Sequence, residues 1–159
     1  MKRSIFFFSS LVIISLFIVS CSSSKYLPPD VSKNAMGITN PDNKAVVYIY
    51  RISSMGFAVG LSVDINNKEV TTFFPKQFYM CVLDPGKYAF TGHGENEDDL
   101  IVTLEPQKKY YIEVTPQMGW VKARCKLTSV EPSVGSTKVQ KCKLVGLNTE
   151  AKTLLQYKE

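Results

Sequence analysis

The chain has little of the chemistry on which many enzymes and metal proteins depend. Its one histidine, His93, excludes a metal site of three histidines and leaves at most one imidazole for catalysis. The four cysteines form no Cys-x-x-Cys motif, so a thioredoxin-like redox function has no support. What the chain does have is 159 residues, 45% of them hydrophobic, with charges of both signs. That composition is typical of a folded chain, and the length predicts one domain.

The first 20 residues have the pattern of a secretory signal peptide. Lys2 and Arg3 form a short basic start, and residues 5–19 are apolar apart from three serines. As a helix this run would be about 22 Å long, shorter than the roughly 30 Å that a membrane-spanning helix covers. No apolar stop-transfer segment follows, because residues 22–25 are three serines and a lysine. The pattern therefore predicts a signal peptide and not a transmembrane helix.

The apolar run ends in Ile18-Val19-Ser20-Cys21, which resembles the lipobox of bacterial lipoproteins. In such proteins an aliphatic residue and a small residue precede an invariant cysteine. The resemblance implies cleavage before Cys21, a diacylglycerol on its thiol and a further acyl chain, such as palmitate, on its amine. The alternatives are an uncleaved anchor, or a plain signal peptide with an incidental cysteine.

The sequence after the cysteine predicts where such a protein resides. Ser22 in the following position is typical of sorting to the outer membrane, and no acidic run indicates export to the cell surface. We therefore expect a lipid-anchored protein of the outer membrane that faces the periplasm. Loss of Lys2 and Arg3 with the signal peptide takes the formal net charge from +5 to +3. A nucleic-acid partner is not indicated by that modest charge or by that compartment.

Three regions are expected in the mature chain. Residues 21–43 contain three prolines and few large apolar side chains, which predicts a flexible tether. Residues 44–147 contain short β-branched and aromatic runs, separated by turn residues at intervals of about 8–12 residues. This pattern predicts a mainly β fold, an antiparallel β-sandwich of the immunoglobulin or prealbumin type. Residues 148–159 are expected to form a short C-terminal helix.

Several local patterns are specific enough to place single elements. The unbroken run at residues 46–50 predicts a strand covered on both faces. The alternation at residues 61–65 predicts a half-buried strand, and Asn66-Asn67 then predicts a tight hairpin turn, because asparagine tolerates positive φ. Trp120 to Val130 is a further strand candidate.

The C-terminal helix is expected to have one apolar face. Asn148 or Thr149 is a candidate cap for its first turn. The face packs on the core in one interpretation and contacts a partner in the other. The residues that share it, at helical spacing, are Leu147, Ala151, Leu154 and Leu155.

The β region contains four motifs in a fixed order: an opening strand, a hairpin, a Pro-Gly-Lys turn and a Tyr-Tyr strand entry. The segments are Ala45–Arg51, Val63–Asn67, Pro85–Tyr88 and Gln107–Tyr111. In this order and spacing they resemble a family of bacterial lipoproteins known as domain of unknown function 2846, and the resemblance covers roughly residues 44–145. The family has no assigned activity. It implies only a sandwich-like lipoprotein domain and supplies no catalytic residues to carry over. We expect no metal or other cofactor.

The acidic loop that contains His93 is the first candidate site. Residues 92–99 read Gly-His-Gly-Glu-Asn-Glu-Asp-Asp, which offers oxygen ligands for a cation. The carboxylates lack the spacing of an EF-hand loop, so a solvated hairpin loop is the simpler interpretation. His93 also has no serine or cysteine at a recognisable motif spacing that would make it a general base.

The cysteines of the body are the second candidate. Cys81 lies in an apolar run and is most simply a small buried hydrophobe. If residues 119–145 form one hairpin that turns at Ser133-Val134, Cys125 and Cys142 face each other within disulfide distance. If residues 132–141 form a short helix, that register is lost and no bridge forms. The sequence leaves both readings open.

Two classes of function remain after these patterns are weighed. The first is a non-enzymatic envelope lipoprotein whose β body binds another envelope protein or a glycan. The second is an envelope enzyme or metal-binding module that uses His93 and the acidic loop, or Cys81. A set of aromatic and methionine side chains either plugs the open end of the sandwich or forms a binding patch. Its members are Met55, Phe57, Phe73, Phe74 and Phe78.

Overall fold

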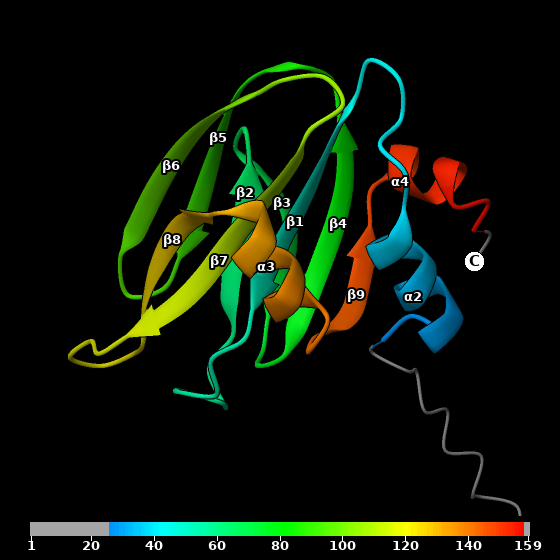
Figure 1. Cartoon of the computed structure of the whole chain (residues 1–159). Helices are drawn as coiled ribbons and strands as arrows, with labels where there is room; N and C mark the ends of the chain where they lie inside the picture. Colours follow the sequence, from blue (N-terminus) through cyan, green and yellow to red (C-terminus); the bar gives the residue numbers. More distant parts are fainter. Residues whose placement is uncertain (1–25, 158–159) are drawn as a thin grey trace, which may run out of the picture.

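Two β-sheets packed face to face, with helices on one outer side, make up the described part of the chain (Figure 1). The structure is a computed structural model, and it describes residues 26–157. The predicted signal peptide, the lipobox and Cys21 lie outside the described residues. Within residues 26–157, no helix is long and apolar enough to span a membrane.

The first half of the chain supplies one helix and five strands. These are α2 (Pro29–Gly37), β1 (Ala45–Arg51), β2 (Leu61–Ile65), β3 (Lys68–Phe73), β4 (Gln77–Leu83) and β5 (Gly86–His93). The second half adds β6 (Glu97–Leu104), β7 (Lys109–Gln117), β8 (Arg124–Val130), α3 (Pro132–Val139), β9 (Lys143–Leu147) and α4 (Thr149–Leu154).

The expected β-sandwich with a short C-terminal helix is confirmed. One sheet has the order β8-β7-β1-β4-β9 and the other β3-β2-β5-β6. The four-stranded sheet is antiparallel throughout, but β1 pairs with β7 and β4 pairs with β9 in parallel, so the five-stranded sheet is mixed. Parallel neighbours need long connections, and α3 lies within the connection that leads to β9.

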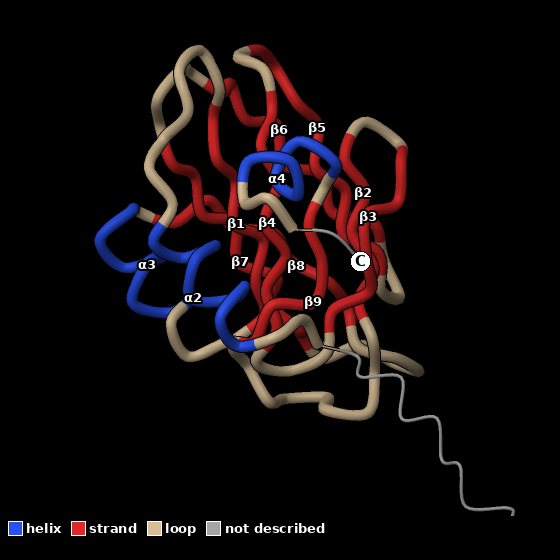
Figure 2. The backbone as a smooth tube through the Cα atoms, turned by 90° about the vertical axis from the view of Figure 1, so that its right-hand side faces the viewer, coloured by secondary structure: helices blue, strands red, loops and turns tan. Residues whose placement is uncertain are grey.

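Strand β1 is the centre of the molecule, as its unbroken apolar sequence predicts. All seven of its residues are buried. Alternate side chains belong to the core between the two sheets, and the others belong to the core under the helices. Figure 2 shows β1 between α2 and α3 on one side and β2 and β3 on the other. Its outer face includes Tyr48, whose ring stacks on Tyr111 of β7 with centroids 5.0 Å apart. Gly135 of α3 fits here because a Cβ at this position would lie 2.4 Å from the Tyr111 Cβ.

The predicted hairpin turn between β2 and β3 is also confirmed. Asn66 and Asn67 have φ angles of 50° and 63°, the left-handed values that a two-residue turn of this kind requires. The Asn66 side chain is fixed as well, because its Oδ1 accepts a hydrogen bond from the Ala89 N–H at 3.0 Å. Asparagine therefore meets both the backbone and the hydrogen-bonding needs of this turn.

The predicted flexible tether is wrong for the part that the structure describes. Pro29 begins α2 at a position where the missing N–H of proline costs nothing, so the prolines mark a helix start here. Val31 and Ala35 lie on one face of α2 and are buried against the five-stranded sheet. The Tyr48 hydroxyl donates a hydrogen bond to the Ala35 carbonyl at 2.7 Å. The body thus begins near Leu27, whose N–H donates to the carbonyl of β9 residue Leu144.

The C-terminal helix is capped by Asn148, one of the two predicted candidates. Its Oδ1 accepts from the Ala151 N–H at 2.9 Å, and the same side chain bonds both the N–H and the carbonyl of Val82. Packing on the core is confirmed for Leu147 and Ala151. It is wrong for Leu154, which is the last residue of the helix and is 41% exposed.

Candidate functional site

The cysteines of the body do not form the hairpin bridge. Cys81, Cys125 and Cys142 are all free and buried. Residues 132–139 form α3, which removes the register that a Cys125–Cys142 disulfide needs. Cys125 faces the core between the sheets, whereas Cys142 lies in the core under the helices. The helical alternative was therefore the correct one.

Burial makes these thiols poor nucleophiles. It raises the pKa of Cys81, Cys125 and Cys142 to about 12 in each case. A thiolate is the reactive form of cysteine, and at such pKa values almost none is present near neutral pH. Cys81 behaves as the small buried hydrophobe that its apolar surroundings predict.

His93 lies on the outer face of the four-stranded sheet, between two carboxylates. Its Nε2 is 3.1 Å from Asp64 Oδ2 on β2, and its Nδ1 is 3.4 Å from Glu97 Oε1 on β6. These groups line a hollow of about 250 Å³, to which Ala89 and Thr91 also contribute. The described residues contain no group of three or more His, Cys, Asp or Glu side chains placed to hold a metal ion.

The acidic loop after His93 joins the two sheets and is not simply a solvated turn. Both Glu95 carboxylate oxygens are used: Oε1 accepts from the Trp120 N–H at 3.0 Å, and Oε2 from the Val121 and Lys122 N–H groups at 2.7 and 2.8 Å. Three backbone donors converging on one carboxylate lower the pKa of Glu95 to about 2. The loop that connects β7 to β8 is thereby held by a side chain from the opposite sheet.

Two further side chains continue this contact along β8. Asn96 accepts from the Cys125 N–H at 2.8 Å and donates to the Cys125 carbonyl at 3.1 Å, as a neighbouring strand would. Asp98 Oδ2 accepts from the Leu127 N–H at 2.7 Å. Side chains thus occupy backbone groups of β8, the edge strand of its sheet, which would otherwise be open to pairing with another chain. No sequence pattern in the acidic loop indicated this role.

The Glu95 contact predicts a pH dependence of stability. Because the pKa of Glu95 is lower in the folded chain than its ordinary value of 4.5, its contribution is complete above that value. It is lost as the pH falls towards 2. We expect Glu95→Gln to be less stable than the wild type at neutral pH, and the difference to shrink between pH 4.5 and pH 2. Urea unfolding at several pH values measures it.

A matched control for this prediction is Glu131→Gln. Glu131 precedes α3, and its side chain makes no capping hydrogen bond to that helix. We expect Glu131→Gln to keep the pH dependence of the wild type. A constant difference in stability between Glu95→Gln and the wild type from neutral pH down to pH 2 would contradict the assigned role of Glu95.

Two neighbouring loops present a cluster of exposed apolar side chains, which we call the apolar end. One loop connects β1 to β2 and the other connects β7 to β8. They line a common hollow of about 220 Å³, to which both contribute. The apolar end consists of Met55, Phe57, Met118, Trp120 and Val121, which are 47% to 96% exposed.

The sequence anticipated this surface only in part. Of the expected cluster, Met55 and Phe57 are exposed, whereas Phe73 and Phe78 are fully buried in the core. Trp120 was expected in a strand, but β8 begins only at Arg124. The sequence nevertheless contains an indication of an apolar loop here, because Met118 to Val121 is a short apolar run that contains glycine.

The buried Arg51 shapes the first of these loops. It is the last residue of β1 and is completely buried. Its Nη1 donates to the carbonyls of Val59 at 2.7 Å and Phe73 at 3.1 Å. Its Nη2 donates to the carbonyls of Met55 at 2.7 Å and Gly56 at 2.9 Å. The guanidinium therefore binds the loop by its backbone and leaves the Met55 and Phe57 side chains facing outward.

No protein-family model matches the chain, and no curated protein matches it. The resemblance to domain of unknown function 2846 stays a prediction.

Proposed function

We propose that this chain is a lipid-anchored bacterial envelope protein that acts by binding and not by catalysis. It would be held by Cys21 at the outer membrane and face the periplasm. Membership of domain of unknown function 2846 is part of the same proposal. The observation that carries it is the lipobox-like Ile18-Val19-Ser20-Cys21, followed almost at once by a folded β body that begins near Leu27.

The chemistry of the described residues supports binding over catalysis. The three thiols of the body are buried and protonated, so they are not available as nucleophiles. The acidic side chains Glu95 and Asp98 are used to hold β8 and its loop in place. By contrast, the apolar end exposes five large side chains on loops that are fixed by hydrogen bonds. Exposed apolar clusters of this kind are typical of interaction surfaces.

Replacement of Cys21 tests the anchor. In the wild type, mass spectrometry of the N-terminal peptide from isolated membranes should give a peptide that begins at Cys21 and carries three acyl chains. Cys21→Ser should abolish this modification completely, because serine has no thiol to accept the diacylglycerol. Acyl chains contribute about 0.8 kcal/mol per buried CH₂, so three of them make release from the membrane negligible.

The matched control is Cys81→Ala, which removes a buried thiol and should leave lipidation unchanged. An unmodified Cys21 thiol in wild-type protein recovered from the soluble fraction would overturn the proposal.

A further inference from the structure

We propose that the apolar end docks on the surface of the lipid bilayer that holds the Cys21 anchor. This rests on the proposed function for the anchor and adds a second, independent point of contact. The body would then lie against the membrane in one fixed orientation.

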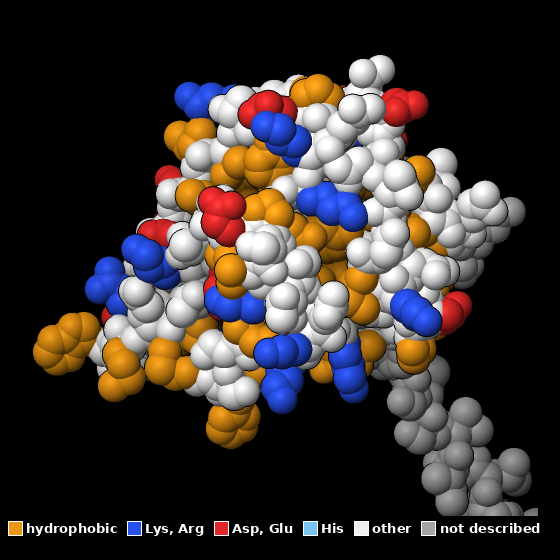
Figure 3. Space-filling model, in the orientation of Figure 1, with side chains coloured by type: hydrophobic (Ala, Val, Ile, Leu, Met, Phe, Trp, Pro, Cys, Tyr) orange, Lys and Arg blue, Asp and Glu red, His pale blue; other side chains and the backbone are white. Residues whose placement is uncertain are grey.

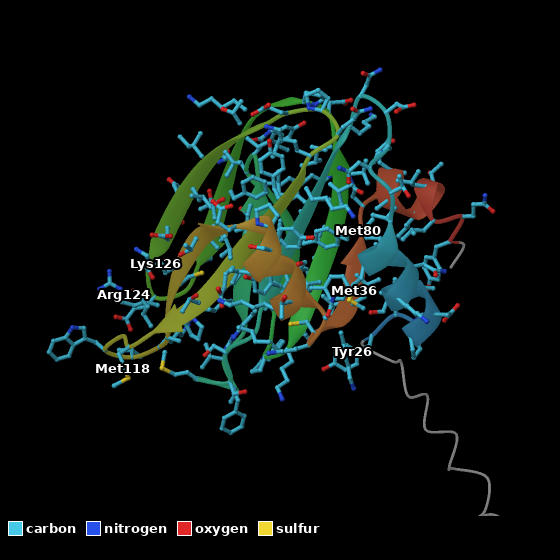
Figure 4. The ribbon with its side chains drawn as sticks, viewed as in Figure 1. Tyr26, Met36, Met80, Met118, Arg124 and Lys126 are labelled. Atoms are coloured by element: carbon cyan, nitrogen blue, oxygen red, sulfur yellow. The ribbon has the colours of Figure 1, made fainter. Side chains whose placement is uncertain are left out.

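Strand register places the apolar end and the start of the body at the same end of the sandwich. Arg51 at the end of β1 pairs with Gln77 at the start of β4, and Gln77 pairs with Lys143 at the start of β9. Strand β7 is parallel to β1, so its last residue, Gln117, lies at that end too. Tyr26 lies there because the Lys143 Nζ is 5.2 Å from the centroid of its ring. Figure 4 shows Tyr26 and Met118 on the same lower side.

The short link between the anchor and the body keeps this end of the sandwich near the membrane. Cys21 is five residues from Tyr26, and a chain of that length spans at most about 18 Å. The packing of α2 is what shortens the link, because a tether that ran to residue 43 would let the body stand well clear of the bilayer. With so short a link, the end that carries Tyr26 must stay close to the lipid headgroups.

The two points of contact are far enough apart to fix an orientation. The start of β9 lies at one edge of the five-stranded sheet, and the loop between β7 and β8 lies at the other. With strands about 4.8 Å apart, three intervals to β7 and four to β8 separate them by about 14–19 Å. A lipid at one edge and inserted side chains at the other would resist tilting of the body.

The chemistry of this end fits a bilayer surface. Tryptophan, phenylalanine and methionine are suited to the boundary between headgroups and acyl chains, and tryptophan is enriched there. Exposed basic residues surround them, and basic side chains favour contact with anionic lipids. Figure 3 shows orange and blue side chains together along the lower edge of the molecule. The exposed basic residues of the loops and strand ends here are Lys76, Lys122, Arg124, Lys141 and Lys143.

The loops are held in a shape that keeps these side chains out of the protein core. Arg51 binds four carbonyls around the first loop, and Glu95 binds three N–H groups of the second. Trp120 is 96% exposed although its own N–H is fixed. Ordering the loops in advance lowers the entropy cost of insertion.

The experiment uses Trp120, the only tryptophan of the chain, as the probe. Full-length protein purified from membranes is reconstituted into vesicles of phosphatidylethanolamine and phosphatidylglycerol, with or without lipids brominated on the acyl chains. We expect the Trp120 emission to lie at shorter wavelength than that of free tryptophan in water. We also expect it to be quenched by the brominated lipids and to be protected from quenching by acrylamide.

Two sets of variants make the test specific. In Trp120→Phe/Ile101→Trp the probe moves to an exposed position on the outer face of β6, where quenching by brominated lipid should be lost. Phe57→Asp/Val121→Asp keeps Trp120 but places charges in the apolar end, and it too should lose the quenching. Ile101→Asp adds a charge on the outer face of β6 and should keep it.

The outcomes separate this proposal from the proposed function. If the N-terminal peptide carries lipid but Trp120 stays open to acrylamide and unquenched by brominated lipid, docking is wrong and the anchor stands. If Trp120 is quenched by lipid in protein whose Cys21 is unmodified, docking stands and the anchor is wrong. Protection of Trp120 in native membranes but not in pure lipid vesicles would overturn docking on lipid in favour of a protein partner.

Discussion

Replacing Arg51 with alanine is expected to lower the free energy of unfolding by about 3–5 kcal/mol. The guanidinium is completely buried and donates to four carbonyl oxygens, from Met55, Gly56, Val59 and Phe73. Alanine would leave these acceptors without their partner and would open a large cavity. Urea unfolding followed by circular dichroism measures the change.

Two further variants make the Arg51 prediction specific. Arg51→Lys keeps the charge but cannot reach all four carbonyls, so we expect a loss between those of the wild type and Arg51→Ala. Arg124 is exposed at the start of β8, and Arg124→Ala should change the stability by no more than about 0.5 kcal/mol. Equal effects of Arg51→Ala and Arg124→Ala would show that the buried contacts contribute little.

Adding one methyl group at Gly94 is expected to cost about 2–4 kcal/mol. A Cβ here would lie 2.6 Å from the Ala123 carbonyl oxygen and 2.8 Å from the Cys125 backbone nitrogen. Both are backbone atoms and cannot rotate aside, so the β5–β6 hairpin would have to move away from β8. That movement would break the hydrogen bonds that Glu95 and Asn96 make across the sandwich.

The same substitution at Gly37 is the control. Nothing lies within 4 Å of a Cβ at Gly37, the last residue of α2, so Gly37→Ala should be neutral or stabilise by about 0.4–1 kcal/mol. Thermal unfolding of the two variants beside the wild type gives the comparison. Similar melting temperatures for Gly94→Ala and Gly37→Ala would mean that the hairpin adjusts freely.

Both predictions concern the end of the sandwich that carries the exposed apolar side chains. Arg51 fixes one of its loops from within the sheet, and the hairpin at Gly94 and Glu95 fixes the other from the opposite sheet. A variant that loosens either loop should therefore also weaken the lipid contact of Trp120. The stability and the docking of this end depend on the same hydrogen bonds.

The sequence was sufficient to predict those elements whose own residues favour one conformation. The β-branched and aromatic run of β1 favours a strand covered on both faces, and Asn66-Asn67 fits a turn with two positive φ angles. Asn148 was correctly named as a helix cap. The β-sandwich followed from such patterns, although the two parallel pairings did not, since pairing partners are not encoded in any single run.

Contacts between residues far apart in the sequence decided the rest. Pro28-Pro29 is compatible with both a linker and a helix start, and only the packing of Val31 and Ala35 on the core selects the helix. Residues 132–139 were compatible with a turn or a helix. They form the helix α3, which separates Cys125 from Cys142. The acidic loop looked solvated because its partners, the N–H groups of residues 120–122, lie more than twenty positions away.

The sequence by itself therefore determined the strand content, the sharpest turn and the expectation of a lipid at Cys21, because each depends on neighbouring residues. The tertiary structure alone decided how close the body begins to that cysteine and which apolar side chains stay outside. Burial depends on what the rest of the chain places over a residue, and here Arg51 and Glu95 hold two apolar loops outward at the end where the body begins.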